Sequence, residues 1–119
     1  GQVASTTPKG ARTSTTEEGN PYRPFDLCSL VRAAGASYVA GFSVTQPMAL
    51  VKAIKKSLFH SGFSFIEVLS PCPTQFGRRN RPDRPDEMIK DLIHRCILEE
   101  ETKGLTQEEM AERIITGEF

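Results

Sequence analysis

Residues 62–74 read Gly-Phe-Ser-Phe-Ile-Glu-Val-Leu-Ser-Pro-Cys-Pro-Thr, an apolar run that leads into one cysteine between two prolines. Seven of the eight residues from Phe63 to Ser70 are apolar or small, and they occupy both alternating faces. A strand covered on both sides has this composition, whereas a strand with one wet face alternates with polar residues. The run therefore predicts a buried strand in a parallel sheet with helices packed on each face.

The cysteine of this stretch, Cys72, is held in a stiff loop. Each proline fixes φ near about −65° and removes a backbone donor, and a residue that precedes a proline is pushed towards extended conformations. In open parallel sheets, ligands and cofactors collect outside the carboxyl ends of the strands, where this loop would lie. The thiol is therefore a candidate for chemistry, and the alternative is a buried, inert cysteine.

Length and composition set the class of protein. A chain of 119 residues can form one small domain. There is no apolar run of about 18 residues and no signal peptide pattern, so no membrane segment is predicted. The first residues are Gly1-Gln2 rather than a methionine, which indicates a part of a longer protein.

Three cysteines, Cys28, Cys72 and Cys96, are an odd number and form no C-x-x-C pair. This usage favours a reducing, cytoplasmic setting. A complete zinc or iron–sulfur site normally needs about four ligands, which three scattered cysteines and two histidines cannot easily supply. Any cluster would have to be shared with ligands from outside this chain.

The zero net charge conceals two unlike halves. Residues 1–84 carry eleven lysines and arginines against five acidic residues, whereas residues 85–119 carry four against ten. These halves could pair with each other or with oppositely charged partners. The counts leave both possibilities open.

Residues 1–24 show no apolar periodicity and are predicted to form an extended loop. They contain an approximate repeat, in which Ser-Thr-Thr-Pro-Lys-Gly at 5–10 returns as Ser-Thr-Thr-Glu-Glu-Gly at 14–19. This composition is typical of a flexible polar linker. The sharper alternative is a loop wrapped along a cofactor or a partner subunit.

Helix, strand, helix and strand then follow one another. Asp26 is placed to cap a helix that stops before Gly35, and residues 38–42 are a short apolar strand. A second helix begins at Pro47 and keeps one apolar face as far as residue 58. The strands at 38–42 and 63–70 are therefore joined by a βαβ crossover, which should be right-handed with parallel strands.

The acidic half is predicted to be a helical hairpin. Its first helix is capped by Asp83 or a neighbour, extends to about residue 103 and stops at Gly104. Thr106 and Glu109 have the spacing of a capping box, so a last short helix begins at about Gln107. Only two strands are then predicted in the whole chain, and the missing strands of the sheet must lie elsewhere. The apolar positions of the first helix are Ile89, Leu92, Ile93, Cys96 and Ile97.

Other polar residues carry weaker signals. Glu67 is the one charge inside the apolar strand, and it must be paired, hydrogen-bonded or at a site, because burying an unpaired carboxylate is costly. His60 lies at a helix end, where a cation favours the dipole, and His94 lies beside an apolar helix stripe; neither is assigned a function. The arginines of residues 78–84 could bind phosphate or nucleic acid, but no aromatic residue is interleaved, so a solvated or interface loop is favoured.

Short segments between residues 1 and 80 also match the pattern of one known family. They are GQ at 1–2, STTP at 5–8, GN at 19–20, PFD at 24–26, AAGA at 33–36, YVA at 38–40, His60, GFSFIEVLSPCPT at 62–74 and FGRRN at 76–80. Together they closely resemble the beta subunit of 2-oxoacid:ferredoxin oxidoreductases, nearest the 2-oxoglutarate type. The block around Cys72 is the most specific part of the resemblance.

The resemblance implies an enzyme that oxidatively decarboxylates a 2-oxoacid, forms the acyl-coenzyme A and passes electrons through iron–sulfur clusters to ferredoxin. The implied fold class is α/β, part of a thiamine-diphosphate-binding parallel-sheet fold with a C-terminal helical hairpin. Residues 1–80 would be the C-terminal half of the thiamine-diphosphate-binding domain, with 1–24 as its extended loop. Residues 81–119 would be a C-terminal helical extension, and the chain by itself is expected to be inactive.

The resemblance also assigns site residues. In the family, the cysteine in the Ser-Pro-Cys-Pro position is the fourth ligand of the [4Fe–4S] cluster nearest the thiamine, so Cys72 is the expected metal ligand. Gly1 and Gln2 match the end of the cofactor-binding loop and are expected to contact thiamine diphosphate. The family's Gly-Asp-Gly motif, Mg²⁺ ligands and three other cluster cysteines precede this segment and are absent here. The glutamate that activates the thiamine comes from the alpha subunit, so Glu67 is not given that role and no catalytic residue is expected.

The implied partners are the alpha subunit, with gamma and delta subunits as further candidates, and also ferredoxin and coenzyme A. The setting is cytoplasmic, with no nucleic-acid or membrane partner. The choice of 2-oxoacid and the coenzyme A contacts stay open, because the residues that decide them lie largely upstream or on the partner. The alternative function is a non-catalytic interaction module, in which the arginine-rich loop and the acidic helices dock a partner and Cys72 is structural.

Overall fold

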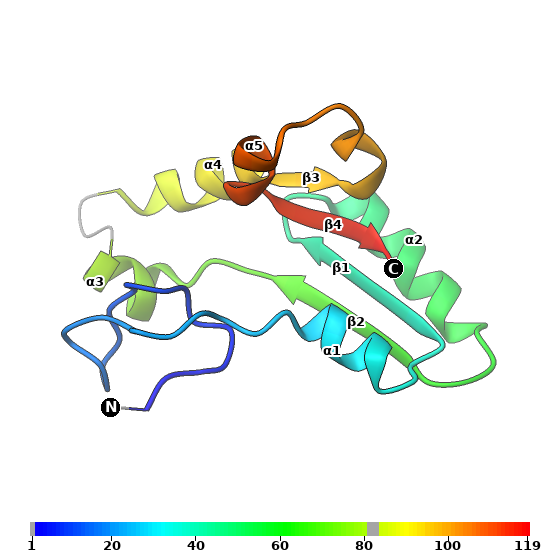
Figure 1. Ribbon diagram of the computed structural model, residues 1–119, viewed down its shortest axis with the longest axis horizontal. Coiled ribbons are helices and arrows are strands. Elements are labelled where there is room, and N and C mark those ends of the chain that lie inside the picture. The colour runs from blue at the N-terminus through cyan, green and yellow to red at the C-terminus, as the bar shows by residue number, and fades with distance from the viewer. Residues whose placement is uncertain (1, 81–83) are drawn as a thin grey trace.

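The computed structural model describes residues 2–80 and 84–119. Within these residues, a four-stranded sheet in the order β2-β1-β4-β3 runs through the molecule (Figure 1). The elements in chain order are α1 (Leu27–Ala33), β1 (Tyr38–Ser43), α2 (Pro47–Leu58), β2 (Ser64–Leu69), the π-helical turn η1 (Pro73–Gly77), α3 (Arg78–Asn80), α4 (Pro85–Arg95), β3 (Cys96–Leu98), the 3-10 turn η2 (Glu99–Thr102), α5 (Gln107–Ala111) and β4 (Ile114–Glu118).

The first helix and its boundaries follow the predicted signals. The Asp26 carboxylate accepts a hydrogen bond from the Ser29 amide at 2.9 Å, and hydrogen bonds from the Ser29 side chain and backbone lower the pKa of Asp26. Gly35 follows the helix with a φ of +98°, a conformation that glycine adopts without strain. Helix α2 begins at Pro47, as predicted.

Helices α1 and α2 cover opposite faces of the sheet (Figure 1). On one face, the Cys28 sulfur of α1 lies 3.1 Å from the point that a Cβ on Gly41 would occupy. On the other face, Ala53 of α2 packs in a buried cluster with Ala40 and Phe42 of β1. Because neighbouring residues of a strand point to opposite faces, these contacts confirm a sheet with a helix on each side.

Strands β1 and β2 are parallel, with Tyr38 opposite Ser64, but the prediction that β2 is covered on both faces is wrong. Phe63 is 64% exposed and Val68 is 44% exposed, whereas all six residues of β1 are buried. β2 is the outer strand of the order, and no strand of the described residues pairs with its second edge. An apolar run shows that a strand favours burial, but it does not show which of two apolar strands lies inside.

The predicted C-terminal helical hairpin is also wrong. Helix α4 ends at Arg95, and the chain continues as β3, η2, α5 and β4. Strand β4 lies between β1 and β3: it is antiparallel to β1, with Gly117 opposite Gly41, and parallel to β3, with Ile114 opposite Cys96. Two strands that were expected outside the chain are therefore supplied by its own C-terminal residues.

Local composition and the open edge of β1 explain this difference. Residues 114–116 are Ile-Ile-Thr, and β-branched side chains favour extended backbone. The edge of β1 presents backbone groups that need partners, and the chain supplies them there, with the Phe119 amide donating to the Val39 carbonyl at 2.8 Å. The spacing of Cys96 and Ile97 fits a helix stripe as well as a strand, so periodicity alone could not separate the two.

A buried polar chain joins β4 to its neighbours. The Thr116 hydroxyl donates to the Ile97 carbonyl at 2.9 Å and accepts from the Gln46 Nε2 at 2.9 Å. The Gln46 Oε1 in turn accepts from the Ser43 amide at 3.1 Å. Thr116 is 1% exposed, so these hydrogen bonds satisfy groups that water cannot reach.

The acidic half keeps one predicted feature and pairs with the basic half. Thr106 and Glu109 form the predicted capping box at the start of α5, with the Glu109 carboxylate accepting from the Thr106 amide at 2.8 Å. Glu118 of β4 forms an ion pair with Lys56 of α2. Of the two possibilities left open by the charge counts, pairing between the halves is therefore present in the structure.

Candidate cofactor and metal site

A cavity of about 490 Å³ opens at the carboxyl end of β2. Its walls come from residues 6–8 of the N-terminal loop, residues 69–72 after β2, and helix α4, including Asp91 and Arg95. Strands β1 and β2 both run towards this edge of the sheet, and the N-terminal loop lies beside it (Figure 1). Cys72 is thus at the edge where α/β sheets bind ligands.

The thiol of Cys72 is exposed and lies at the start of a tight turn. Cys72 has the extended conformation that a following proline imposes, with φ −111° and ψ 94°. The chain then turns sharply, and the N–H groups of Gln75, Phe76 and Thr74 hydrogen-bond to the sulfur and lower the pKa of Cys72. Donors that stabilise the thiolate make the sulfur a better metal ligand at neutral pH.

The other two cysteines lie in different surroundings. Cys28 is buried, and its thiol donates to the Glu67 carboxylate at 3.5 Å. Burial, together with the negative charge of Glu67, raises the pKa of Cys28 to about 12. Burial also raises the pKa of Cys96. Both are buried packing residues, although Cys96 lies in β3 and not on the helix where its spacing had placed it. The carboxylate of Glu67 has the polar partner that its position required.

We expect Cys72 to react with iodoacetamide in the native protein on the order of a hundredfold faster than Cys28 or Cys96, because the exposed thiolate is the reactive species. A short pulse at neutral pH, followed by peptide mass mapping, measures the three rates. All three thiols should react alike in urea. Equal labelling of Cys28 and Cys72 in the folded protein would contradict this account of the thiols.

The N-terminal loop is ordered by hydrogen bonds rather than being a flexible linker. Asn20 is 2% exposed, and its side-chain amide donates to the Thr7 carbonyl at 2.8 Å. The Gly10 amide donates to the Asn20 carbonyl at 2.7 Å, and the Asn20 amide donates to the Ala11 carbonyl at 2.9 Å. These bonds tie the first copy of the approximate repeat, and Ala11 after it, to the residue that follows the second copy. Thr7, which is held in this way, lies in the cavity wall.

Gly1 and Gln2 are the two residues expected to contact thiamine diphosphate. Gly1 lies outside the described residues. Gln2 is exposed, and its carbonyl accepts a hydrogen bond from the Thr15 hydroxyl. Gln2 is not among the described residues that line the cavity. The structure therefore does not bring Gln2 and Cys72 into one site.

The histidines take structural positions. The His60 Nε2 lies 2.9 Å from the Ser37 hydroxyl, and the His60 ring lies 5.6 Å from the Tyr38 ring. His60 lies just past the end of α2, where the sequence placed it, and its side chain joins this end to the start of β1. His94 is exposed on α4.

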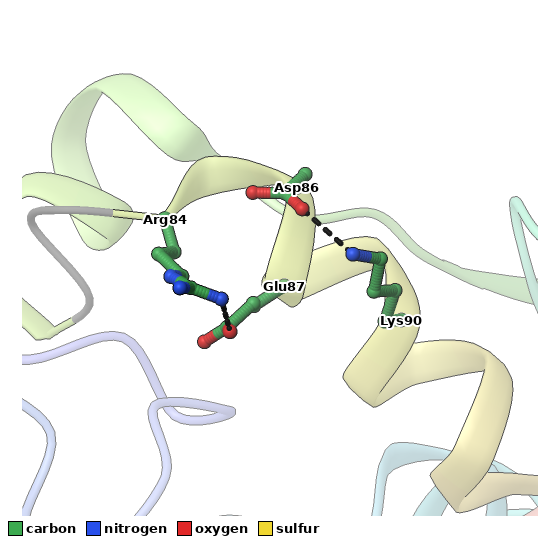
Figure 2. A network of polar contacts seen from close by, with 4 residues as sticks. All are labelled: Arg84, Asp86, Glu87 and Lys90. Carbon is green, nitrogen blue, oxygen red and sulfur yellow. Dashed lines mark hydrogen bonds and ion pairs between the residues drawn. The ribbon is translucent and has the colours of Figure 1, made fainter.

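The arginines of residues 78–84 are partly engaged within their own helices. Arg84 pairs with Glu87 at 2.8 Å, next to a second pair between Asp86 and Lys90 at 2.8 Å; Figure 2 shows both at the start of α4. Arg79 donates to the Gln75 carbonyl and side chain at 3.1 Å. Arg81 and Asp83, the latter a candidate helix cap, lie outside the described residues. These contacts support the prediction of a solvated loop.

Two parts of the cavity were not predicted from the sequence: the wall formed by α4, and Asn80. Asp91 and Arg95 of α4 lie in the wall and pair with each other at 3.4 Å. Their i, i+4 spacing predicts a pair on the helix, but it does not predict that the helix faces Cys72. Asn80 was part of the FGRRN segment, and no role followed from its residue type alone. Among residues 2–80 and 84–119, no group of three or more metal-ligating side chains is arranged to hold a metal ion.

A parallel βαβ unit with a cavity at its carboxyl edge is the arrangement in which α/β proteins bind ligands and cofactors. Residues 1–68 match the family described as "Thiamine pyrophosphate enzyme, C-terminal TPP binding domain". The chain belongs to this family. In the described residues, no helix is both long and apolar enough to cross a membrane.

The chain is similar over its full length to archaeal proteins named 2-oxoglutarate synthase subunit KorB. It is 45% identical to the KorB of Methanothermobacter marburgensis and covers 42% of that chain, and it is 43% identical to the KorB of Methanocaldococcus jannaschii and covers 44% of that chain. It is 35% identical over 81 residues to the pyruvate synthase subunit PorB of Methanocaldococcus jannaschii, covering 64% of this chain and 27% of that one. These matches confirm the resemblance that the sequence segments indicated, including its nearest type.

The fold is similar to that of a solved 2-oxoglutarate:ferredoxin oxidoreductase from Magnetococcus marinus with 2-oxoglutarate, coenzyme A and succinyl-CoA bound. The TM-score is 0.69 over 99% of this chain and 40% of that chain, at 22% sequence identity. This likeness confirms the α/β fold. The sequence spans about two fifths of the length of these relatives.

Proposed function

We propose that this chain forms part of the beta subunit of a ferredoxin-linked 2-oxoacid oxidoreductase, nearest the 2-oxoglutarate type. The reaction converts a 2-oxoacid, coenzyme A and two oxidised ferredoxins into acyl-coenzyme A, carbon dioxide, one proton and two reduced ferredoxins. The observation that carries the proposal is the placement of Cys72. A stiff turn holds its exposed thiol in a cavity at the carboxyl end of a parallel strand, in a chain similar to subunits of such enzymes.

The role proposed for Cys72 is to ligate a [4Fe–4S] cluster. Two features suit it to that role: exposure, and a pKa that backbone hydrogen bonds lower. Hydrogen bonds to the ligand sulfurs are among the factors that set cluster potentials. The remaining ligands would come from outside the described residues, because three or more suitable side chains are not grouped within them.

Thiamine diphosphate with Mg²⁺ is the second proposed cofactor. When bound, it supplies the carbon nucleophile and the electron sink for decarboxylation, while the cluster accepts electrons. Gly1 and Gln2 are the proposed contacts of this chain, and the described one, Gln2, has an exposed side chain available to a ligand. The ordered loop of residues 4–25 contributes one wall of the cavity beside Cys72.

The proposed partners are an alpha subunit, gamma and delta subunits, ferredoxin and coenzyme A, in the cytoplasm. The alpha subunit would supply the glutamate that activates the thiamine, since Glu67 is already hydrogen-bonded to Cys28. The proposed division at residue 80 separates a cofactor-binding part from a C-terminal part that completes the sheet through β4.

A turnover assay tests this proposal. The intact subunit is purified without air together with its alpha partner, and reduction of ferredoxin is followed with coenzyme A and each of 2-oxoglutarate, pyruvate and 2-oxoisovalerate. We expect reduction that depends on both coenzyme A and the 2-oxoacid and is fastest with 2-oxoglutarate. Absence of reduction with all three acids would overturn the proposed function, and preference for another acid would overturn the substrate type.

A further inference from the structure

We propose that Asn80 is a positioning residue that locks the turn carrying Cys72 to the N-terminal loop and so sets the surroundings of the cluster. This inference rests on the proposed function, because it concerns the same site. It goes beyond that function by naming the side chain that joins two walls of the cavity, which come from opposite ends of the first 80 residues.

The contacts of Asn80 form a complete clamp. Its Oδ1 accepts from the Arg12 amide at 2.8 Å, and its Nδ2 donates to the Arg12 carbonyl at 2.9 Å. The same Nδ2 donates to the Phe76 carbonyl at 2.9 Å. One side-chain amide therefore binds both backbone groups of a loop residue 68 positions away and, at the same time, the turn that follows Cys72.

Phe76 connects this clamp to the thiol. Its amide donates to the Cys72 carbonyl at 3.1 Å, and the next amide, that of Gly77, donates to the same carbonyl at 2.9 Å. These two bonds fix the backbone of Cys72 relative to the turn. A shift of Phe76 would therefore move the Cys72 backbone and the ligand sulfur with it, and the surroundings of the ligand sulfur are one of the protein's means of tuning a cluster.

The turn is also packed against α4. Gly77 is buried, and a Cβ at this position would lie 2.9 Å from the Met88 sulfur of α4. The turn is thus close to α4 at Gly77 and is bonded to the N-terminal loop through Asn80. Asn80 and Met88 both line the cavity, together with Thr6, Thr7 and Pro8 of the same loop.

The test uses Asn80→Leu in the intact, cluster-loaded complex, because leucine keeps a similar size, adds no charge and removes all three hydrogen bonds. We expect the hydrogen exchange of the Arg12 amide and its loop neighbours to speed up about tenfold, as the loss of a small set of hydrogen bonds implies. We also expect a shifted reduction potential and an altered electron paramagnetic resonance line shape for the cluster. Asn80→Gln, which keeps the amide, should restore part of that spectrum.

Lys90→Gln is the control. It breaks an exposed ion pair with Asp86 on α4 that involves no residue of the turn, and it should leave both the exchange rate and the cluster spectrum unchanged. Faster exchange in Asn80→Leu with an unchanged cluster potential and spectrum would show that Asn80 only anchors the loop, and this result would overturn the inference. Unchanged exchange in Asn80→Leu would overturn it as well. Cys72→Ser in the same complex separates the two claims: a cluster that survives this change overturns the ligand assignment, whereas a cluster lost there but unaltered in Asn80→Leu overturns only the role of Asn80.

Discussion

Replacing Thr116 with valine is expected to lower the free energy of unfolding by about 2–3 kcal/mol, because each buried polar group left without a partner costs about 1–3 kcal/mol. The Thr116 hydroxyl is the partner of both the Gln46 side chain and the Ile97 carbonyl. Valine has nearly the same shape as threonine and fills the same space, so the loss of stability reports the missing hydrogen bonds alone. Urea unfolding followed by circular dichroism measures the difference.

Thr116→Ser is the matched control for this change. Serine keeps the hydroxyl and loses one methyl group, so its expected cost is about 1 kcal/mol, the value of one buried methyl or methylene group. The ranking should therefore be wild type, serine, valine in falling stability. A valine variant as stable as the wild type would contradict the placement of β4 as an inner strand tied to both α2 and β3.

Replacing Gly19 with alanine is expected to open the N-terminal loop. Gly19 has a φ of +97°, and a Cβ there would lie 2.7 Å from the Gly10 carbonyl oxygen. The left-handed conformation costs an L-residue about 1–2 kcal/mol, and a contact with backbone at this distance cannot be relieved by a side-chain rotation. We expect a total of about 3 kcal/mol, which corresponds to about a hundredfold loss of protection, for the Gly10 and Asn20 amides in hydrogen exchange.

Gly10→Ala separates strain from clash. Gly10 has a similar φ of +81°, but nothing lies within 4 Å of the point where its Cβ would stand. Its substitution should therefore show the conformational cost alone, about 1.4 kcal/mol. This cost corresponds to about a tenfold loss of protection of the same amides in hydrogen exchange. Equal effects of the two substitutions would contradict the close approach of the two repeat copies.

Much of the α/β part could be predicted from local signals. The cap at Asp26, the proline at the start of α2 and the apolar runs at 38–42 and 63–70 each act within a few residues, so the sequence contains the physical cause of each element. The parallel arrangement followed from the order of these elements. The position of each strand in the sheet did not follow from this order. Which of β1 and β2 is buried depends on which strands pair with their free edges.

The C-terminal strands were missed because their cause is not local. Residues 114–116 gain strand structure by pairing with β3, and residues 117–118 pair with β1, which is more than 70 residues earlier in the chain. Such tertiary pairing overrides a helix-compatible stripe. Within the site, Cys72 could be singled out by its two prolines and by the resemblance. Asn80 and the α4 wall could not, since both depend on how separate segments meet.

The central claim is that Cys72 ligates an iron–sulfur cluster, and the most direct measurement is the electron paramagnetic resonance spectrum of the reduced complex carrying Cys72→Ser, with iron quantified in the same sample. We predict that the signal of the cluster nearest the thiamine is abolished or shifted and that iron per subunit falls, while Cys28→Ala, a change at the buried thiol beside Glu67, keeps both. An unchanged signal with full iron content in Cys72→Ser would contradict the account.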